Sequence, residues 1–179
     1  MTEENCILNE VSLGRTLTRM AHEILERNLE ANGMVIIGIQ RPGVFLAQRL
    51  AIMLQGIMGK SIPIGSLDIS MHRDDLDTKV APKVYPTEIP FDISGKTVIL
   101  VDDVLFSGRT IRAALDALND FGRPRQVQLA VLVDRGHREL PIKADFVGKN
   151  VPTSLTDHIE ARLREIGGDD SVWLFHQKP

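Results

Sequence analysis

The sequence predicts an α/β fold in which a central, mainly parallel sheet is flanked by helices and followed by a C-terminal hairpin. Continuous apolar runs, which are typical of strands buried on both faces, alternate with segments whose apolar residues repeat at helical spacing. Such alternation of strands and helices is the pattern of a parallel sheet. The length of 179 residues is close to that of one domain, so residues 1–179 are expected to form a single domain.

The first half of the chain contains two predicted helices and two predicted strands. Apolar side chains at helical spacing predict a helix over residues 12–31, with Ser12 as its N-cap and Asn32-Gly33 at its end. Residues 34–39 predict a strand, and a turn at residues 40–43 leads into a second helix that includes residues 46–54. Residues 62–69 predict another strand. Residues 71–90 have little periodicity and are predicted to be a long loop and a candidate lid.

The second half continues with a strand, a helix and a strand, and its tail is ambiguous. Residues 96–101 predict a buried strand, and Ser107-Gly108 leads into a helix whose apolar positions include Leu115. Residues 122–124 end that helix, residues 127–133 predict the next strand, and residues 134–143 are polar. Residues 159–166 fit a strand or a helix, but the turn at residues 167–170 and the alternation after it favour a hairpin that closes the sheet.

The composition excludes several classes of protein. Apolar residues make up 43% and charged residues 25%, which is typical of globular chains and not of disordered or fibrous ones. Apolar runs such as residues 129–133 are far shorter than the roughly 20 residues that cross a bilayer. Residues 1–5 lack the order of a secretory signal, and Cys6 has no partner for an internal disulfide, so the cytoplasm is expected. With a net charge of −3, any nucleic-acid site must be a local patch.

Residues 98–110 carry the strongest chemical signal. Asp102 and Asp103 come at the end of a buried strand, and Ser107, Gly108 and Thr110 follow at the start of a helix. Ligands of open α/β sheets bind beyond the carboxyl ends of the strands, and the free amides of a helix N-terminus hold phosphate. Adjacent carboxylates accept strong hydrogen bonds from vicinal hydroxyls. Together these features predict a site for a ribose 5-phosphate.

Other interpretations of the carboxylate pair remain. It could be a metal site of the receiver or phosphatase type, or a helix cap. A receiver domain needs a further phosphoacceptor Asp and a Lys, for which no convincing spacing is present. A Walker loop is excluded, because that loop requires Gly-x-x-x-x-Gly-Lys followed by Ser or Thr.

Residues 98–110 resemble the phosphoribosyl pyrophosphate signature of type I phosphoribosyltransferases. Residues 17–23, 68–76, 122–124, 129–141 and 148–154 resemble one branch of that family, the bifunctional pyrimidine operon attenuation regulators that are also uracil phosphoribosyltransferases. The resemblance extends from about residue 7 to residue 154. It implies the type I phosphoribosyltransferase fold, with a C-terminal hairpin or hood.

The resemblance also implies the reaction. Ribose 5-phosphate would pass from phosphoribosyl pyrophosphate to uracil, giving UMP and pyrophosphate, with Mg²⁺ bound through phosphoribosyl pyrophosphate and no metal held by the protein alone. Asp102, Asp103 and Arg73 are the candidate catalytic residues. The candidate substrate-binding residues are Arg41, Val104, Leu105, Phe106, Ser107, Gly108, Arg109, Thr110, Asp134 and Arg135.

One turn departs from the family pattern. The family usually shows Thr-Arg-Gly after the first strand, whereas this chain has Arg41-Pro42-Gly43. Pro42 removes a backbone N–H that could bind pyrophosphate, and it permits a cis peptide bond. A regulator that binds nucleotides without significant enzyme activity is therefore an alternative, and a purine or orotate phosphoribosyltransferase is a further, disfavoured one.

The family also binds messenger RNA, and part of its RNA motif matches here. Thr18, Arg19 and His22 lie at helical spacing on the face opposite Leu17. The resemblance implies contacts with the leader mRNA of pyrimidine genes, and it implies a homo-oligomer of two or more chains. A salvage enzyme without RNA binding is the alternative. The candidate RNA-binding residues are Thr18, Arg19, His22, His137, Arg138 and Lys143.

Overall fold

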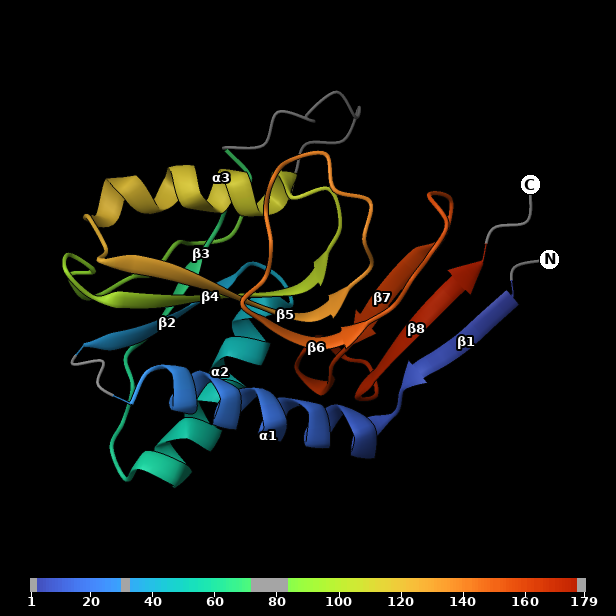
Figure 1. Ribbon diagram of the computed structural model, residues 1–179, viewed down its shortest axis with the longest axis horizontal. Helices are drawn as coiled ribbons and strands as arrows, with labels where there is room; N and C mark the ends of the chain where they lie inside the picture. Colours follow the sequence, from blue (N-terminus) through green and yellow to red (C-terminus); the bar gives the residue numbers. More distant parts are fainter. Residues whose placement is uncertain (1–2, 30–32, 72–83, 177–179) are drawn as a thin grey trace.

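The computed structural model describes residues 3–29, 33–71 and 84–176. Its centre is a five-stranded parallel sheet with the order β3-β2-β4-β5-β6 (Figure 1). Helix α3 covers one face of this sheet, and helices α1 and α2 cover the other. A second sheet of three strands, with the order β1-β8-β7, lies beyond the carboxyl ends of the parallel strands. Within the described ranges, no helix has the length and apolar character needed to cross a membrane.

The elements follow one another as strand and helix in the first two thirds of the chain and as strands in the last third. In chain order they are β1 (Glu3–Leu8), α1 (Glu10–Arg27), β2 (Met34–Ile39), α2 (Gly43–Met58), β3 (Ile64–Leu67), β4 (Thr97–Leu105), α3 (Arg109–Leu118), η1 (Asn119–Phe121), β5 (Gln126–Asp134), β6 (Phe146–Asn150), β7 (His158–Arg162), η2 (Arg164–Ile166) and β8 (Ser171–His176).

The parallel sheet confirms the predicted fold class and corrects two strand lengths. β2 has the predicted bounds, and all six of its residues are buried. β3 is shorter than the predicted strand over residues 62–69. β4 is longer than predicted, because its ladder with β5 continues through Asp102, paired with Val131, to Leu105, paired with Asp134. The carboxylate pair therefore lies within a paired strand and not in a loop after it.

Helix α1 begins before the predicted position. Asn9 is its N-cap, and the backbone N–H of Ser12 donates to Asn9 Oδ1 at 2.9 Å while the N–H of Asn9 donates to Ser12 Oγ at 2.8 Å. Ser12 is thus the third residue of a capping box, and the prediction of Ser12 as N-cap was wrong. The helix ends at Arg27, before the predicted end, and Asn32 lies outside the described residues.

Two apolar clusters fill the spaces on the two faces of the parallel sheet. The larger cluster joins α1 and α2 to one face of the sheet and includes Ile159 and Leu174 of the small sheet. The other cluster joins α3 to the opposite face. In α3 the predicted apolar position Leu115 is an exception, because it is 38% exposed. Burial on both faces explains why the central strands are continuous apolar runs.

The C-terminal hairpin is present, but it does not close the parallel sheet as predicted. β7 and β8 pair antiparallel, and β8 also pairs with β1, so that Cys6 lies opposite Trp173. β1 was not predicted, because its sequence Glu-Glu-Asn-Cys-Ile-Leu is polar for half its length and shows no clear alternation. The first and last strands of the chain therefore build a separate sheet over the carboxyl edge of the central one.

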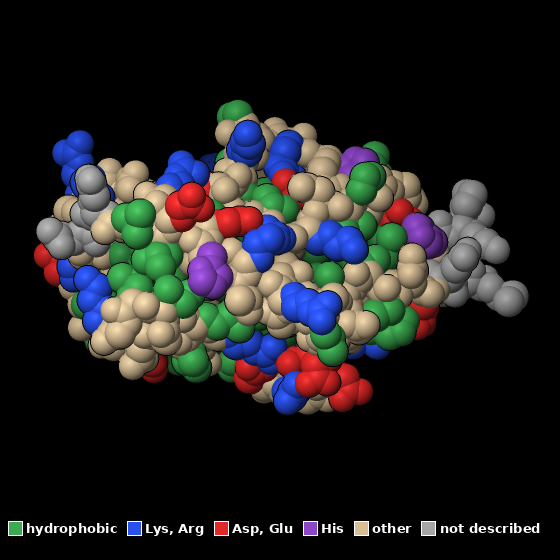
Figure 2. Space-filling view, turned by 60° about the horizontal axis from the view of Figure 1, so that its bottom comes forward, with side chains coloured by type: hydrophobic (Ala, Val, Ile, Leu, Met, Phe, Trp, Pro, Cys, Tyr) green, Lys and Arg blue, Asp and Glu red, His purple; other side chains and the backbone are tan. Residues whose placement is uncertain are grey.

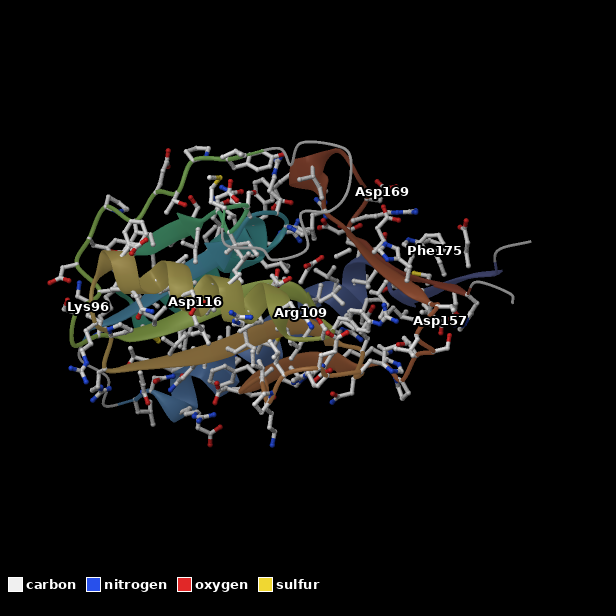
Figure 3. All side chains as sticks on the ribbon, turned by 90° about the horizontal axis from the view of Figure 1, so that it is seen from above. Lys96, Arg109, Asp116, Asp157, Asp169 and Phe175 are labelled. Atoms are coloured by element: carbon white, nitrogen blue, oxygen red, sulfur yellow. The ribbon has the colours of Figure 1, made fainter. Side chains whose placement is uncertain are left out.

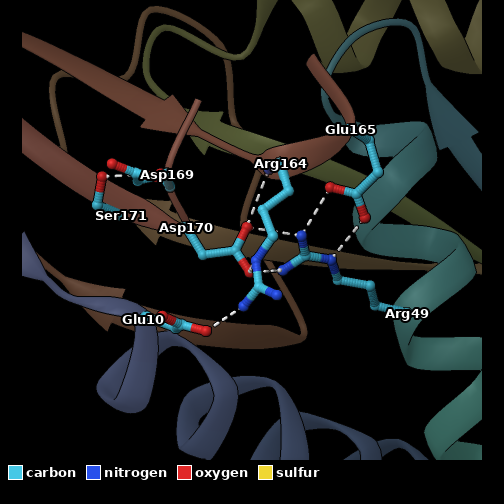
Figure 4. Close-up of polar contacts among 7 residues, drawn as sticks. All are labelled: Glu10, Arg49, Arg164, Glu165, Asp169, Asp170 and Ser171. Carbon is cyan, nitrogen blue, oxygen red and sulfur yellow. Dashed lines mark hydrogen bonds and ion pairs between the residues drawn. The ribbon is translucent and has the colours of Figure 1, made fainter. Parts of the chain in front are cut away.

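Ion pairs connect the small sheet to α2 (Figure 4). Arg49 of α2 donates from Nε and Nη2 to Glu165, at 2.8 and 2.6 Å, and from Nη1 and Nη2 to Asp170, at 3.0 and 2.7 Å. Arg164 pairs with Asp170 and also with Glu10 of α1. The hydrogen bonds from Arg49 lower the pKa of Glu165. Burial opposes ionisation of Asp170, but the bonds from Arg49 and from the N–H of Arg164 outweigh it and lower the pKa of Asp170.

We predict that Arg49→Gln lowers the free energy of unfolding by roughly 2 kcal/mol at pH 7, because charge-assisted hydrogen bonds to two carboxylates are lost. Carboxyls with lowered pKa values stabilise the fold above their ordinary values of 4.5 and 3.8, and this contribution disappears as the pH falls through the lowered values. The difference between variant and wild type should therefore shrink below about pH 4.5. Urea unfolding at pH 7 and at a pH below about 4.5 measures this difference. The exposed Arg123→Gln serves as the control. A difference that stays constant with pH would contradict it.

Candidate functional site

The strongest candidate site lies at the carboxyl edge of the parallel sheet, where three parts of the chain meet. A cavity of about 220 Å³ there joins the turn after β2, the segment after β3 and the end of β4. It is lined by Gln40, Arg41, Asp68, Ile69, Ser70, Tyr85, Asp102, Asp103, Val104 and Thr110. The structure thus brings Arg41, the carboxylate pair and the start of α3 together, as the sequence predicts.

The two carboxylates differ in their surroundings. Asp102 is 6% exposed, and its Oδ1 accepts a hydrogen bond of 3.0 Å from the backbone N–H of Asp103. Burial raises the pKa of the Asp103 carboxyl, which disfavours its charged form. A pair of polar hydroxyl groups bound here would compensate that cost, because each would donate a hydrogen bond to a carboxylate.

The carbonyl groups at the start of the loop over residues 106–110 are bound by the segment after β5, which does not line the cavity. The carbonyls of Leu105 and Ser107 accept from backbone N–H groups of the segment after β5, with distances between 3.0 and 3.2 Å. The carbonyl of Phe106 accepts from Arg138 Nη1 at 2.8 Å. The N–H of Arg109 donates to Ser107 Oγ at 3.4 Å, and the next amides of α3 have no partner within the helix, as at every helix N-terminus. The loop therefore offers N–H donors and a favourable dipole to an anion.

Gly108 is required by the shape of this loop. It is the N-cap of α3 and has a φ of +93°, a conformation that residues with a Cβ rarely adopt. A Cβ at this position would lie 3.3 Å from Cβ and Cδ1 of Ile142. The loop is therefore packed closely against the segment after β5, and Arg109, the first helical residue, pairs with Glu139 of that segment at 2.7 Å.

Arg41 lies in the turn between β2 and α2, next to the carboxylates. The Arg41–Pro42 peptide bond is cis. Gly43 brings the start of α2 against β4, since a Cβ there would lie only 2.5 Å from the carbonyl oxygen of Val101. The Arg41 guanidinium lies near two aromatic rings, 5.1 Å from the ring centroid of Phe45 and 5.2 Å from that of Tyr85. Its planar group is thus held at the mouth of the site by cation–π contacts.

Asp68 and Tyr85 belong to the site although the sequence did not single them out. Asp68 accepts from the N–H of Ser70 at 2.8 Å and from the N–H of Tyr85, and its own N–H donates to Thr87 Oγ1 at 2.9 Å. One carboxylate therefore joins the two ends of the long loop. The only available signal was the inclusion of Asp68 in the family-like residues 68–76. Arg73 and most of the candidate lid over residues 71–90 lie outside the described residues.

Asp134 is the last residue of β5 and Arg135 follows it, but their side chains contact protein groups. Asp134 accepts from the N–H of Gly136 at 3.0 Å and pairs with Arg138. The side chain of Arg135 donates to Thr153 and Ser154. Their side chains are thus engaged by the turns around the site, and neither lines the cavity beside the carboxylate pair.

The predicted RNA-binding residues of α1 share one exposed face. Thr18, Arg19 and His22 are all exposed, and Arg19 pairs with Glu23 at 2.7 Å. The Arg19 guanidinium also donates to the carbonyls of Val147, at 3.4 Å, and of Gly148 in β6. Figure 2, which turns the side below the sheet forward, shows Lys and Arg side chains with a histidine among them and acidic side chains nearby.

The other predicted RNA-binding residues are divided between two places. Arg138 donates to the carbonyls of Phe106 and Ile142, at 2.8 and 2.9 Å, so its guanidinium supports the loop over residues 106–110, the predicted phosphate loop. His137 Nε2 lies 2.7 Å from the carbonyl oxygen of Thr153. Lys143 is exposed and lies two residues before Asp145, which pairs with Arg27 of α1 at 2.8 Å. Lys143 is thus two residues from a contact with the last residue of α1, whereas Arg138 contacts the phosphate loop.

Figure 3 shows the molecule from above, with the start of α3 marked by Arg109. Arg109 lies at the end of α3 that faces the small sheet, where Asp157 and Phe175 lie, and Lys96 lies at the opposite end of the molecule.

The residues of the described ranges contain no group of three His, Cys, Asp or Glu side chains placed to hold a metal ion. The arrangement combines an anion-binding helix start, paired acceptors for hydroxyl groups and an arginine in one cavity.

The chain is similar to known proteins over most of its length. Residues 7–162 match the phosphoribosyl transferase domain family. Bifunctional protein PyrR of Streptomyces coelicolor is 59% identical over 173 residues, which cover 96% of this chain and 90% of that protein. Bifunctional protein PyrR of Pelotomaculum thermopropionicum is 56% identical over 171 residues, covering 95% and 94%. The protein of that name from Thermus thermophilus is 51% identical over 173 residues, covering 96% of each.

Solved structures share the fold at low sequence identity. A hypoxanthine-guanine phosphoribosyltransferase from Bacillus anthracis superposes with a TM-score of 0.73 at 19% identity, covering 99% of this chain and 100% of that one. A hypoxanthine phosphoribosyltransferase from Staphylococcus aureus gives a TM-score of 0.66 at 17% identity, covering 87% and 80%. These similarities show that the fold is that of the type I phosphoribosyltransferases.

Proposed function

Because the chain belongs to the phosphoribosyl transferase family, and within it to the bifunctional PyrR proteins, we propose that it is a uracil phosphoribosyltransferase that also regulates pyrimidine biosynthesis genes. Uracil and phosphoribosyl pyrophosphate would give UMP and pyrophosphate. RNA binding that depends on uridine nucleotides would give the regulation. One observation supports the proposed enzyme activity above all: the carboxylates Asp102 and Asp103 line the same cavity as Thr110, which belongs to the phosphate loop.

Each part of the cavity has a role in this reaction. Asp102 and Asp103 accept hydrogen bonds from the ribose hydroxyls, and the amides of residues 106–110 bind the 5-phosphate. Val104 and Leu105 carry the backbone from the carboxylates into the loop. This holds the sugar by its vicinal hydroxyls and by its phosphate, so the anomeric carbon, which is bonded to the carbon of the 2-hydroxyl, has a fixed position for attack by N1 of uracil.

The departing pyrophosphate gains negative charge as the bond to the anomeric carbon breaks. Arg41, which lines the cavity and contacts two aromatic rings, stabilises this charge, and Arg73 is proposed for the same purpose. Mg²⁺ bound through phosphoribosyl pyrophosphate would neutralise part of it. The carboxylates of the cavity are hard oxygen donors of the kind that Mg²⁺ accepts, directly or through water.

The regulatory part rests on α1. Thr18, Arg19 and His22 present hydroxyl, guanidinium and imidazole groups on one exposed face, and Lys143 adds a cation on the chain that passes the end of this helix. Such groups bind phosphates and the edges of unpaired bases. The partner is the leader mRNA of pyrimidine genes. We further propose a single domain over residues 1–179, a homo-oligomer and a location in the cytoplasm.

Incubation of the purified protein with phosphoribosyl pyrophosphate, Mg²⁺ and each nucleobase in turn tests the reaction. We predict that uracil gives UMP and that hypoxanthine, guanine and orotate give at least about a hundredfold less nucleotide, since one base-shaped site discriminates by several kcal/mol. Chromatography of the products measures this. Formation of a purine nucleotide would replace the proposed substrate. Formation of none would leave a regulator that only binds nucleotides.

Asp103→Asn should reduce kcat/KM for phosphoribosyl pyrophosphate by about ten- to 150-fold, because a charge-assisted hydrogen bond to a ribose hydroxyl is weakened. Only the ionised carboxyl accepts this bond at full strength. Since burial raises the pKa of Asp103 above 3.8, wild-type kcat/KM should fall on acidification at a higher pH than an ordinary aspartate allows.

Steady-state rates across pH measure both effects, with Asp116→Asn on the exposed side of α3 as the matched control. The Asp103→Asn enzyme should lack the acidic fall that Asp103 causes, while the control keeps it. Wild-type kinetics in the Asp103→Asn enzyme would remove the ribose assignment of this residue.

Arg19→Glu should weaken binding to the leader RNA by at least about tenfold and flatten the log–log salt dependence by about 0.7 for each phosphate that the protein no longer neutralises. UMP should strengthen wild-type binding. Gel-shift titrations at several salt concentrations measure these effects, and uracil turnover should remain. Arg123→Glu, an exposed arginine before β5, is the control for charge alone. Arg138 is unsuitable here, because it supports the phosphate loop. Equal RNA binding by both variants would exclude the α1 surface.

A further inference from the structure

Arg135, directly after β5, is enclosed by the turn that precedes β7. The residue is 6% exposed. Its Nε donates to Thr153 Oγ1 at 3.1 Å, and its Nη2 donates to the carbonyl of Ser154 at 2.8 Å. The hydroxyl of Thr153 in turn donates to the carbonyl of Arg135 at 3.2 Å. Both the backbone and the side chain of Arg135 are therefore fixed by the same turn.

The flat face of the Arg135 guanidinium covers the ring of Phe106. The Cζ atom lies 4.2 Å from the ring centroid, which is shorter than the other arginine–ring distances given above. Burial lowers the pKa of Arg135 from 12.5, and the carboxylate of Asp157 opposes this shift. The side chain remains charged at neutral pH, and a cation–π contact is stronger where water is excluded.

Phe106 is the first residue of the phosphate loop, and donors after β5 hold its backbone as well. Arg138 binds the carbonyl of Phe106 at 2.8 Å, and the backbone N–H of Arg135 binds the carbonyl of Leu105 at 3.1 Å. The ring of Phe106 also has the edge of His137 beside it, with 6.1 Å between centroids. The direction of the loop amides thus depends on Phe106, whose ring is held by Arg135 and whose carbonyl is held by Arg138.

We propose that Arg135 is a positioning residue for the phosphate loop: it connects the turn before β7 to Phe106 and so aims the loop amides at the 5-phosphate. This inference rests on the proposed function and deepens it. It replaces the direct substrate contact that the sequence suggested for Arg135. The guanidinium of Arg135 donates hydrogen bonds to Thr153 and Ser154 and packs on the ring of Phe106. Its effect on substrate binding is therefore transmitted through the loop.

Ribose 5-phosphate separates this role from recognition of the base, because it carries the phosphate and the hydroxyls but no base. Arg135→Lys keeps the charge and loses the planar fork. We expect this variant to bind ribose 5-phosphate and UMP about tenfold more weakly, by the same factor for each, as measured by isothermal titration calorimetry. Its KM for phosphoribosyl pyrophosphate should rise, while its KM for uracil stays within about twofold.

Arg125→Lys is the matched control. Arg125 precedes β5 at the opposite end of that strand and also donates to a threonine hydroxyl, Thr97 Oγ1, at 2.9 Å. This variant should bind ribose 5-phosphate like the wild type. If Arg135→Lys does not fold, Thr153→Val gives the answer: loss of its hydroxyl should weaken ribose 5-phosphate binding about threefold without changing the KM for uracil.

The outcomes distinguish the inference from the function on which it rests. If Arg135→Lys weakens UMP but leaves ribose 5-phosphate unchanged, Arg135 contacts the base and the positioning role is wrong. If the folded variants bind both ligands like the wild type, the inference is wrong and the proposed function stands. If the wild-type protein makes no UMP and binds no ribose 5-phosphate, the proposed function itself fails.

Discussion

The candidate site depends on hydrogen bonds that the segment after β5 donates to the carbonyl groups at the start of the phosphate loop. The β4–β5 ladder continues to the pair of Leu105 with Asp134, so the chains leaving both strands run side by side. Backbone N–H groups and Arg138 then bind the carbonyls of residues 105–107. A carbonyl left facing an anion would repel it, and an unbound buried carbonyl would cost free energy. The register of β4 against β5 therefore decides that the N–H groups of the loop, and not its carbonyl groups, are available to an anion.

Helix α2 connects this site to the small sheet. It begins at Gly43, packed against β4 beside the carboxylates, and Arg49 lies about two turns further on. The Arg49 side chain is 19% exposed and holds Asp170, whose side chain is only 7% exposed. A carboxylate so little exposed requires a paired cation. The small sheet is thereby fixed relative to the turn that carries Arg41, although no strand among the described residues joins the two sheets.

The sequence predicted the parts of the structure that local patterns determine. The buried strands, the helices behind them and the residues 98–110 were found because apolar periodicity and the order of carboxylates, glycine and helix start are local. β1 was missed because its own sequence shows no clear alternation and its partner β8 lies at the other end of the chain. The roles of Asp68 and Arg138 were missed for the same reason: each depends on a contact with a distant segment, which single-chain spacing does not encode.

The two proposed functions share the edge of the parallel sheet. Arg19 of α1 binds carbonyls of Val147 and Gly148 in β6. Two residues beyond Gly148, Asn150 pairs with Asp134, and Asp134 holds the Arg138 that supports the phosphate loop. Contiguity of contacts does not by itself produce coupling, which requires two arrangements with different affinities for each ligand. Where such arrangements exist, linkage is reciprocal: RNA strengthens nucleotide binding by the same factor as nucleotide strengthens RNA binding. Asp134, at the end of β5, is the residue that contacts both β6, to which Arg19 binds, and Arg138, which supports the phosphate loop.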